Sequence, residues 1–124
     1  MLLCFAVYKC AVSPTGDRLY ITSPDQNKLL TLARDGTLLA SYTDPALEWP
    51  RCLHVTPAGQ VLVCEYWPPT VLQVGWEGES KLTTLATQER DGVRWPESVC
   101  YSSTTSSIIV GQYQDDNILV FRVE

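Results

Sequence analysis

The chain has 124 residues, enough for one domain and too few for two of ordinary size. Hydrophobic residues make up 45% and charged residues 19%, which excludes a disordered or fibrous chain. The formal net charge of −5 disfavours nucleic acid as a partner, because phosphate binding depends on Lys and Arg, and the 9 present are scattered singly.

In chain order, the first third predicts short strands joined by tight turns. Pro14-Thr15-Gly16-Asp17 places Pro and Gly as a turn requires, and Asp35-Gly36 is a strong hairpin signal. The strands expected here are 10–13, 19–22, 29–33 and 38–42. No segment shows a sustained apolar period of 3.6 residues, so we expect minimal helix.

Two later units repeat this plan. Trp49-Pro50 and Trp95-Pro96 open segments that lie 46 residues apart, and the strands that follow are offset by 47. The offset between the first and second units is 42 or 43 residues. The strands expected in the two later units are 50–55, 61–66 and 71–74, then 96–101, 108–113 and 118–121.

A unit of this length with short antiparallel strands is typical of one blade of a β-propeller. We therefore predict an all-β fold, a partial β-propeller of about three four-stranded blades whose last blade is incomplete. The expected blades are 8–49, 50–95 and 96–124, with 1–7 as a candidate outer strand of a preceding blade. A β-sandwich is the alternative, but it has no reason to repeat Trp-Pro at the same point of each unit.

The repeat resembles the NHL repeat, through Pro50–Glu65 and through Asp115–Phe121 at the end of the last unit. Each motif is degenerate, since only Glu65 keeps the acidic residue that ends the second strand. Divergent propellers of this kind are similar to the C-terminal region of tripartite-motif E3 ubiquitin ligases of the NHL type. The resemblance implies a six-bladed propeller that selects substrates, while catalysis belongs to RING and B-box regions whose cysteine pattern this chain lacks.

The aromatic residues are the main candidates for a binding site. Trp49 and Trp95 occupy equivalent points between units, where they would form either a ligand-facing pair or, as we favour, packing between blades. Tyr66 and Trp67 precede two prolines in a loop, where sheet packing alone does not account for them. They are the best candidates for contact with a partner.

Charged candidates are fewer. Glu65 ends a strand near the expected channel mouth, where it would contact a ligand or cap a turn. Arg51 and Glu97 occupy the same position after Trp-Pro with opposite charge, and each could pair with a neighbouring blade, although surface ion pairs contribute little. Cys52 and His54 lie on one face of a strand, but no orienting carboxylate is evident, so no catalytic residue is predicted.

The five cysteines show no CxxC spacing: Cys4, Cys10, Cys52, Cys64 and Cys100. With a single histidine, a zinc site of four Cys/His ligands is not expected, and we predict no metal or cofactor. We predict reduced, buried thiols and from them a cytoplasmic location. The apolar run 1–7 is too short to span a bilayer, so no membrane association is expected.

We therefore expect a non-catalytic module that recognises a protein partner. The alternatives are a fragment of a propeller-type hydrolase or lyase, which would need clustered metal ligands, and an RNA-binding NHL propeller, which the acidic charge disfavours. The missing outer strand of the last blade would leave open propeller edges, and such edges favour self-association.

Overall fold

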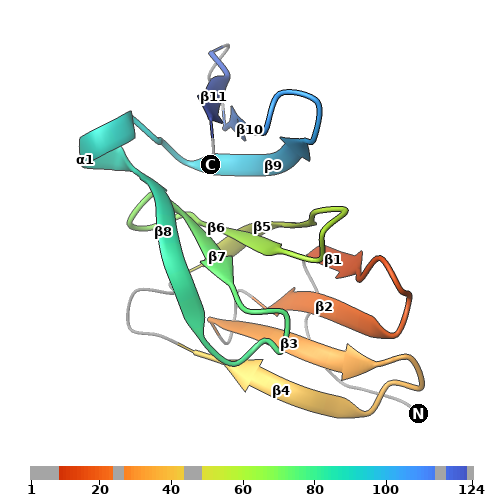
Figure 1. Ribbon diagram of the computed structural model, residues 1–124. Helices are drawn as coiled ribbons and strands as arrows, with labels where there is room; N and C mark the ends of the chain where they lie inside the picture. Colours follow the sequence, from red (N-terminus) through yellow and green to blue (C-terminus); the bar gives the residue numbers. More distant parts are fainter. Residues whose placement is uncertain (1–8, 24–26, 44–48, 114–116, 123–124) are drawn as a thin grey trace.

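The computed structural model describes residues 9–23, 27–43, 49–113 and 117–122, and these form three antiparallel sheets in chain order (Figure 1). The first sheet contains β1 (Lys9–Val12), β2 (Arg18–Ser23), β3 (Lys28–Ala33) and β4 (Leu38–Tyr42). The second contains β5 (Pro50–Val55), β6 (Val61–Glu65), β7 (Thr70–Val74) and β8 (Lys81–Thr87). The third contains β9 (Pro96–Ser102), β10 (Ser107–Gln112) and β11 (Leu119–Arg122).

The predicted all-β architecture is confirmed, and the third sheet has three strands within the described part of the chain. The candidate outer strand 1–7 lies outside the described residues, and the division into domains stays a prediction. One turn of helix, α1 (Gln88–Asp91), joins the second and third sheets. Thr87 Oγ1 caps it by accepting a hydrogen bond from the Arg90 amide, and Gly92 ends it in a left-handed conformation (φ 78°). No described helix has the length and apolar character needed to cross a membrane.

The turns follow the predicted chemistry. At the β3–β4 hairpin, the Thr37 amide donates to Asp35 Oδ1 at 2.9 Å and Gly36 takes φ 92°. That conformation favours glycine, which explains the Asp-Gly pair. The hydrogen bonds from Thr37 also lower the pKa of the Asp35 carboxyl.

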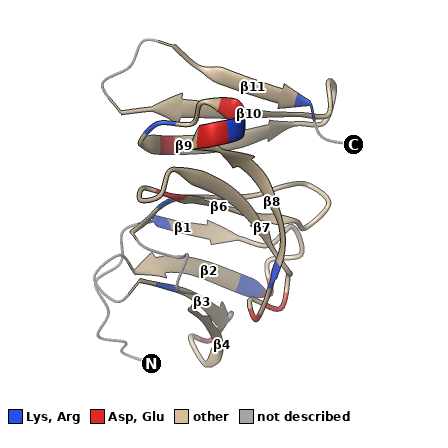
Figure 2. Ribbon diagram, turned by 90° about the vertical axis from the view of Figure 1, so that its left-hand side faces the viewer, with Lys and Arg blue, Asp and Glu red and all other residues tan. Residues whose placement is uncertain are grey.

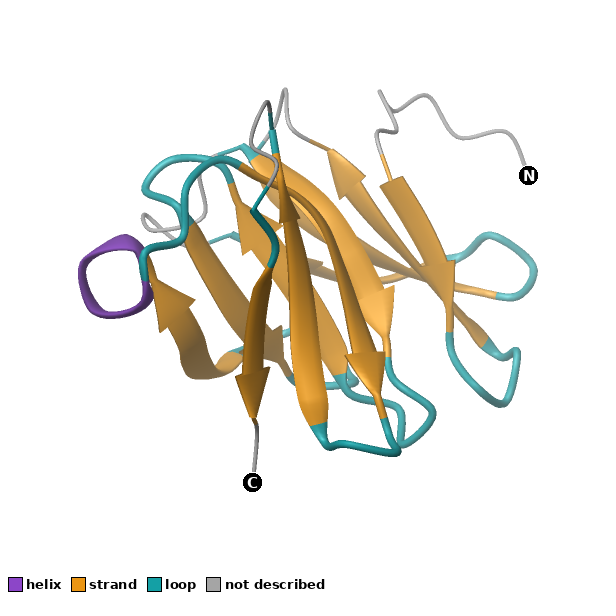
Figure 3. Cartoon of the chain, turned by 90° about the horizontal axis from the view of Figure 1, so that it is seen from above, coloured by secondary structure: helices purple, strands orange, loops and turns teal. Residues whose placement is uncertain are grey.

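The three sheets pack face to face, and the second lies between the other two (Figures 1 and 2). Side chains alternate between the two faces of a strand, so β6 contributes to both interfaces and all five of its residues are buried. Val61 and Val63 pack with the first sheet, whereas Leu62 and Cys64 pack with the third. The first strands β1, β5 and β9 contact one another in succession, and turns gather at the two ends of the strands (Figure 3).

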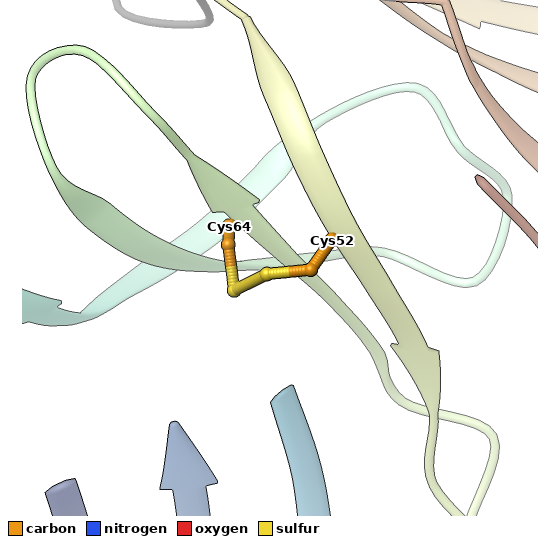
Figure 4. Close-up of a disulfide and its surroundings, with 2 residues drawn as sticks. All are labelled: Cys52 and Cys64. Atoms are coloured by element: carbon orange, nitrogen blue, oxygen red, sulfur yellow. A yellow bond between two sulfur atoms is a disulfide. The ribbon is translucent and has the colours of Figure 1, made fainter. Parts of the chain in front are cut away.

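The prediction of reduced, buried thiols is wrong. Cys52 and Cys64 form a disulfide between β5 and β6 (Figure 4). They are directly opposed partners in the antiparallel register, and their Cα atoms lie 4.9 Å apart, within the range that a disulfide spans. Cys10 and Cys100 are free and exposed. The argument for a cytoplasmic location, which depended on reduced thiols, loses its basis.

Candidate partner-binding site

The two Trp-Pro dipeptides adopt the same local structure. Trp49 and Trp95 immediately precede β5 and β9, and both have a positive φ, 55° and 42°. The Trp49 carbonyl accepts a hydrogen bond from the Tyr66 amide at 3.0 Å, and the Trp95 carbonyl accepts one from the Tyr113 amide at 2.8 Å. A left-handed conformation is costly for a bulky residue and concentrates at functional sites, so the repeated geometry directs attention to these positions.

Trp49, Tyr66 and Trp95 form an aromatic row. Tyr66 lies in the turn between β6 and β7, and its ring meets Trp49 edge-on at 5.9 Å between centroids. On its other side it stacks with Trp95 at 6.3 Å. Trp95 lies in the segment between α1 and β9 and leads directly into the third sheet. The row therefore crosses the boundary between the second and third sheets. Such pairs stabilise by about 0.5–1.5 kcal/mol beyond their buried area.

Arginine side chains accompany this aromatic row. The Arg51 guanidinium lies 4.8 Å from the centre of the Tyr66 ring and forms an ion pair with Glu97 of β9. Arg94 lies 5.7 Å from the centre of the Trp95 ring. The sequence indicated that these residues could pair with neighbouring blades, and the structure pairs them with each other, from β5 to β9. A cation over an aromatic face is attracted by the ring quadrupole, so the arginines orient the rings.

Much of this aromatic surface is open to solvent. Trp49 is 53% exposed, Trp95 39% and Trp67 59%. We call Trp49, Tyr66, Trp67, Trp95 and Tyr113 the aromatic face. Trp67 makes no ring contact among the described residues, and the Trp67–Pro68 peptide bond is cis. Clustered exposed aromatics are uncommon on a protein surface that binds nothing.

The structure brings together four predicted residues, Trp49, Arg51, Tyr66 and Trp95, while Trp67 follows Tyr66 in the same turn without a ring contact to them. Glu65 differs, because its side chain is fully buried and is not part of the exposed surface. It lines a pocket of about 310 Å³ with Pro68, Pro69, β7 and β8. Whether any of these residues contacts a partner stays a prediction.

Sequence reasoning missed Tyr113 and Arg94. The repeat could have identified Tyr113, since Gln112-Tyr113 stands where Glu65-Tyr66 stands one unit earlier, and its ring is 43% exposed. Arg94 directly precedes Trp95 in the sequence, so this adjacency was the available signal, and the structure places the Arg94 guanidinium 5.7 Å from the centre of the Trp95 ring.

The described residues offer little for catalysis. Cys52 has no thiol to act as a nucleophile, because it is bonded to Cys64. His54 is half-buried, burial lowers its pKa, and its Nε2 has no hydrogen-bond partner among the described residues. No group of three His, Cys, Asp or Glu side chains in the described ranges could hold a metal ion.

A second cavity lies at the opposite end of the strands, between the first and second sheets. Its volume is about 340 Å³, and its walls include Arg18, Tyr20 and Trp76. The Tyr20 hydroxyl donates to the Trp76 carbonyl at 2.7 Å, and the Arg18 guanidinium lies 4.6 Å from the Trp76 ring centre. Burial raises the pKa of the Tyr20 hydroxyl. Trp76, 57% exposed, thus serves as a natural comparison for Trp67.

Comparison with solved structures places this arrangement among β-propellers. Hydrazine synthase from Kuenenia stuttgartiensis superimposes with a TM-score of 0.75 at 17% identity, over 94% of this chain and 32% of that one. Virginiamycin B lyase from Staphylococcus aureus gives 0.66 at 16%, over 94% and 41%. The WD40 β-propeller domain of Doa1 gives 0.68 at 21%, over 88% and 34%.

At these identities the likeness shows the fold alone. The chain spans about a third to two fifths of the length of these neighbours, 32–41%. No protein-family model matches the sequence, and no curated protein matches it either.

Proposed function

We propose that this chain is part of a β-propeller that recognises a protein partner through the aromatic face. The observation that carries the proposal is the aromatic row of Trp49, Tyr66 and Trp95, which crosses two sheets and whose two indoles are exposed on either side of a half-buried Tyr66. Tryptophan, tyrosine and arginine are the residues most enriched at binding hot spots. Here all three types lie together, and the rings are held in place before a partner arrives.

Preorganisation supports the same proposal. Hydrogen bonds from the Tyr66 and Tyr113 amides fix the backbone at both Trp-Pro dipeptides. The Arg51–Glu97 ion pair then holds the guanidinium over Tyr66. Side chains already fixed lose less conformational entropy on binding, so more of the contact energy contributes to affinity.

A narrower assignment follows from the resemblance to NHL-type ubiquitin ligases. In that setting the module would select the protein to be ubiquitinated, and the transfer would take place on other domains. This assignment depends on Pro50–Glu65 and Asp115–Phe121, and its support is sequence resemblance alone.

The experiment compares Trp67→Ala with Trp76→Ala in the complete chain. The two indoles are 59% and 57% exposed and lie in turns at opposite ends of β7, so they are matched in exposure. For a partner identified by proximity labelling, we expect Trp67→Ala to weaken binding by about tenfold or more in calorimetry. Trp76→Ala should change affinity by less than about twofold. The opposite ranking would refute the aromatic face as the contact surface.

A second candidate is a segment of a propeller enzyme, which the lyase neighbour motivates. Catalytic groups would then come jointly from this chain and from further blades. RNA binding is less favoured, because the basic residues are spread singly over all three sheets (Figure 2). Anisotropy of labelled single-stranded RNA checks this: salt-dependent binding would support the RNA hypothesis against the protein-binding one.

A further inference from the structure

Arg18 and Arg51 are the two half-buried arginines in the described part of the chain, and each lies over an aromatic ring. The Arg51 guanidinium is 4.8 Å from the Tyr66 ring centre, and the Arg18 guanidinium is 4.6 Å from the Trp76 ring centre. Arg51 also pairs with the carboxylate of Glu97. Within the described residues, the Arg18 guanidinium forms no hydrogen bond and no ion pair. The two arginines thus differ in one component, a carboxylate.

The Arg18 side chain lines the cavity of about 340 Å³ between the first and second sheets. Three turns form this cavity: 13–17 between β1 and β2, 57–59 between β5 and β6, and the start of the β7–β8 turn. Pro14, Pro57 and the Trp76 indole are its apolar walls. Small-molecule sites usually measure about 300–1,000 Å³, so this cavity suits a small ligand.

The atoms that join the two sheets here are not those that face the cavity with free bonding capacity. The Tyr20 hydroxyl donates to the backbone carbonyl of Trp76 at 2.7 Å. The Trp76 indole and the Arg18 guanidinium take no part in that bond, so a ligand could reach both without separating the sheets. A guanidinium presents its N–H donors along its edge, where a carboxylate accepts two parallel hydrogen bonds.

Acidic neighbours limit the charge that a ligand can carry. Asp17 also lines the cavity, and its carboxylate accepts hydrogen bonds from the hydroxyls of Thr15 and Ser13. These bonds lower the pKa of the Asp17 carboxyl, which is therefore charged at neutral pH. Glu77 adds a second acidic residue directly after Trp76. A dianion would be repelled by both, whereas a single carboxylate matches the single guanidinium.

We propose that this cavity binds a small monocarboxylic acid with a flat apolar body. Its carboxylate pairs with the Arg18 guanidinium, as Glu97 pairs with Arg51 at the second interface. Its apolar body lies against the Trp76 indole and the two prolines. The site is at the opposite end of the strands from the aromatic face, so the proposal is independent of any protein partner bound there.

The experiment titrates phenylpropionate into the complete chain and follows nitrogen–proton NMR spectra. The chain has 4 tryptophans, and each indole N–H gives its own signal. We expect the Trp76 signal to shift with added acid and the Trp67 signal to stay in place. Phenylpropionamide has the same body without the charge and should bind about tenfold or more weakly, because it loses the charge-assisted bonds. Phenyl phosphate, a dianion, should also bind more weakly than phenylpropionate.

A pair of variants tests the residue that carries the proposal. Arg18→Gln should weaken phenylpropionate binding by about tenfold or more and leave phenylpropionamide binding unchanged. Arg94→Gln is the matched control, since the Arg94 guanidinium also lies over an indole, 5.7 Å from the Trp95 ring centre, but does not line the cavity. This control should bind the acid as the wild type does.

Four results would overturn the proposal. They are equal binding of the acid and the amide, equal binding of the phosphate and the acid, a shift at Trp67 in place of Trp76, and equal weakening by Arg18→Gln and Arg94→Gln. The probe comparison uses the wild-type chain, so it decides the question even where Arg18→Gln fails to fold. A Trp76 signal that does not move up to the solubility limit of the acid would also refute the site, and it would leave the proposal for the aromatic face intact.

Discussion

The two interfaces between successive sheets bury similar aliphatic side chains, yet they are fixed at opposite ends of the strands. Between the first and second sheets, the β7–β8 turn reaches across: Trp76 accepts a hydrogen bond from Tyr20, and Gly78 lies against Thr31. Between the second and third sheets, contacts lie at the other end, where Tyr66 stacks on Trp95 and Arg51 pairs with Glu97.

The difference predicts which contacts serve stability alone and which would also serve binding. At the first interface the backbone of the β7–β8 turn lies directly against the first sheet, so a substitution there would change packing alone. At the second, exposed rings and a half-buried ion pair fix the sheets and also face solvent, so a partner could engage the same groups. We therefore expect changes at the first interface to alter stability, and changes at the rim of the second to alter binding with little cost in stability.

The largest effect should come from the disulfide in the core of the second interface. Replacing both Cys52 and Cys64 by Ala should lower the free energy of unfolding by about 3 kcal/mol, because the open loop gives the unfolded chain more conformational freedom. Urea denaturation measures the change, and Cys100→Ser is the control because that thiol is exposed. An unchanged denaturation midpoint for the double variant would contradict a stabilising role.

Gly78→Ala should break the first interface. A Cβ at Gly78 would collide with Thr31 Oγ1, and the residue has φ 76°. Gly59→Ala is the matched control, because Gly59 has φ 88° but nothing within 4 Å of the added Cβ. We expect Gly78→Ala to cost about 1–3 kcal/mol more than Gly59→Ala, from overpacking alone. Thermal unfolding of both variants measures the two losses of stability. If the losses are equal, the strain of placing Ala at a positive φ accounts for both, and the contact with Thr31 contributes nothing.

The Trp-Pro repeat and the turn residues were sufficient to predict the three units and their strands, except β8, for which no range was expected. They placed Trp49 and Trp95 at equivalent points but favoured packing between blades, whereas both indoles are exposed and Tyr66 lies between them. They could not predict the disulfide, because opposition of Cys52 and Cys64 depends on strand register, which spacing along the chain does not fix. They also could not predict the burial of Glu65. Glu65 lies on the same face of β6 as Val61 and Val63, which pack with the first sheet, and the burial of that face depends on the packing of the sheets.

The ion pair between Arg51 and Glu97 at the second interface tests whether a contact there serves binding more than stability. Arg51 and Glu97 are 26% and 25% exposed, and a double-mutant cycle with Arg51→Ala and Glu97→Ala should give a coupling of about 1 kcal/mol or less. Binding to the partner should respond more than stability does, because Arg51 also orients Tyr66. A coupling well above this value, without any change in partner affinity, would make the pair a purely structural link.

The smallest effect concerns pH and the single histidine, His54, at the second interface. Burial lowers its pKa, so the unfolded chain binds this proton at a higher pH than the folded chain does. Between the lowered pKa of His54 in the folded chain and its ordinary pKa in the unfolded chain, the free energy of unfolding therefore rises with pH. Acidification from about pH 7.5 to about 5.5 should destabilise the protein. His54→Gln should lose less stability over the same range.

The carboxyls of Asp17 and Asp35, whose pKa values are lowered by hydrogen bonds from Thr15 and Thr37, titrate alike in both proteins. Their contribution cancels when the denaturation midpoints of the two proteins are compared at each pH, and parallel curves would show that His54 stays solvated in the folded chain.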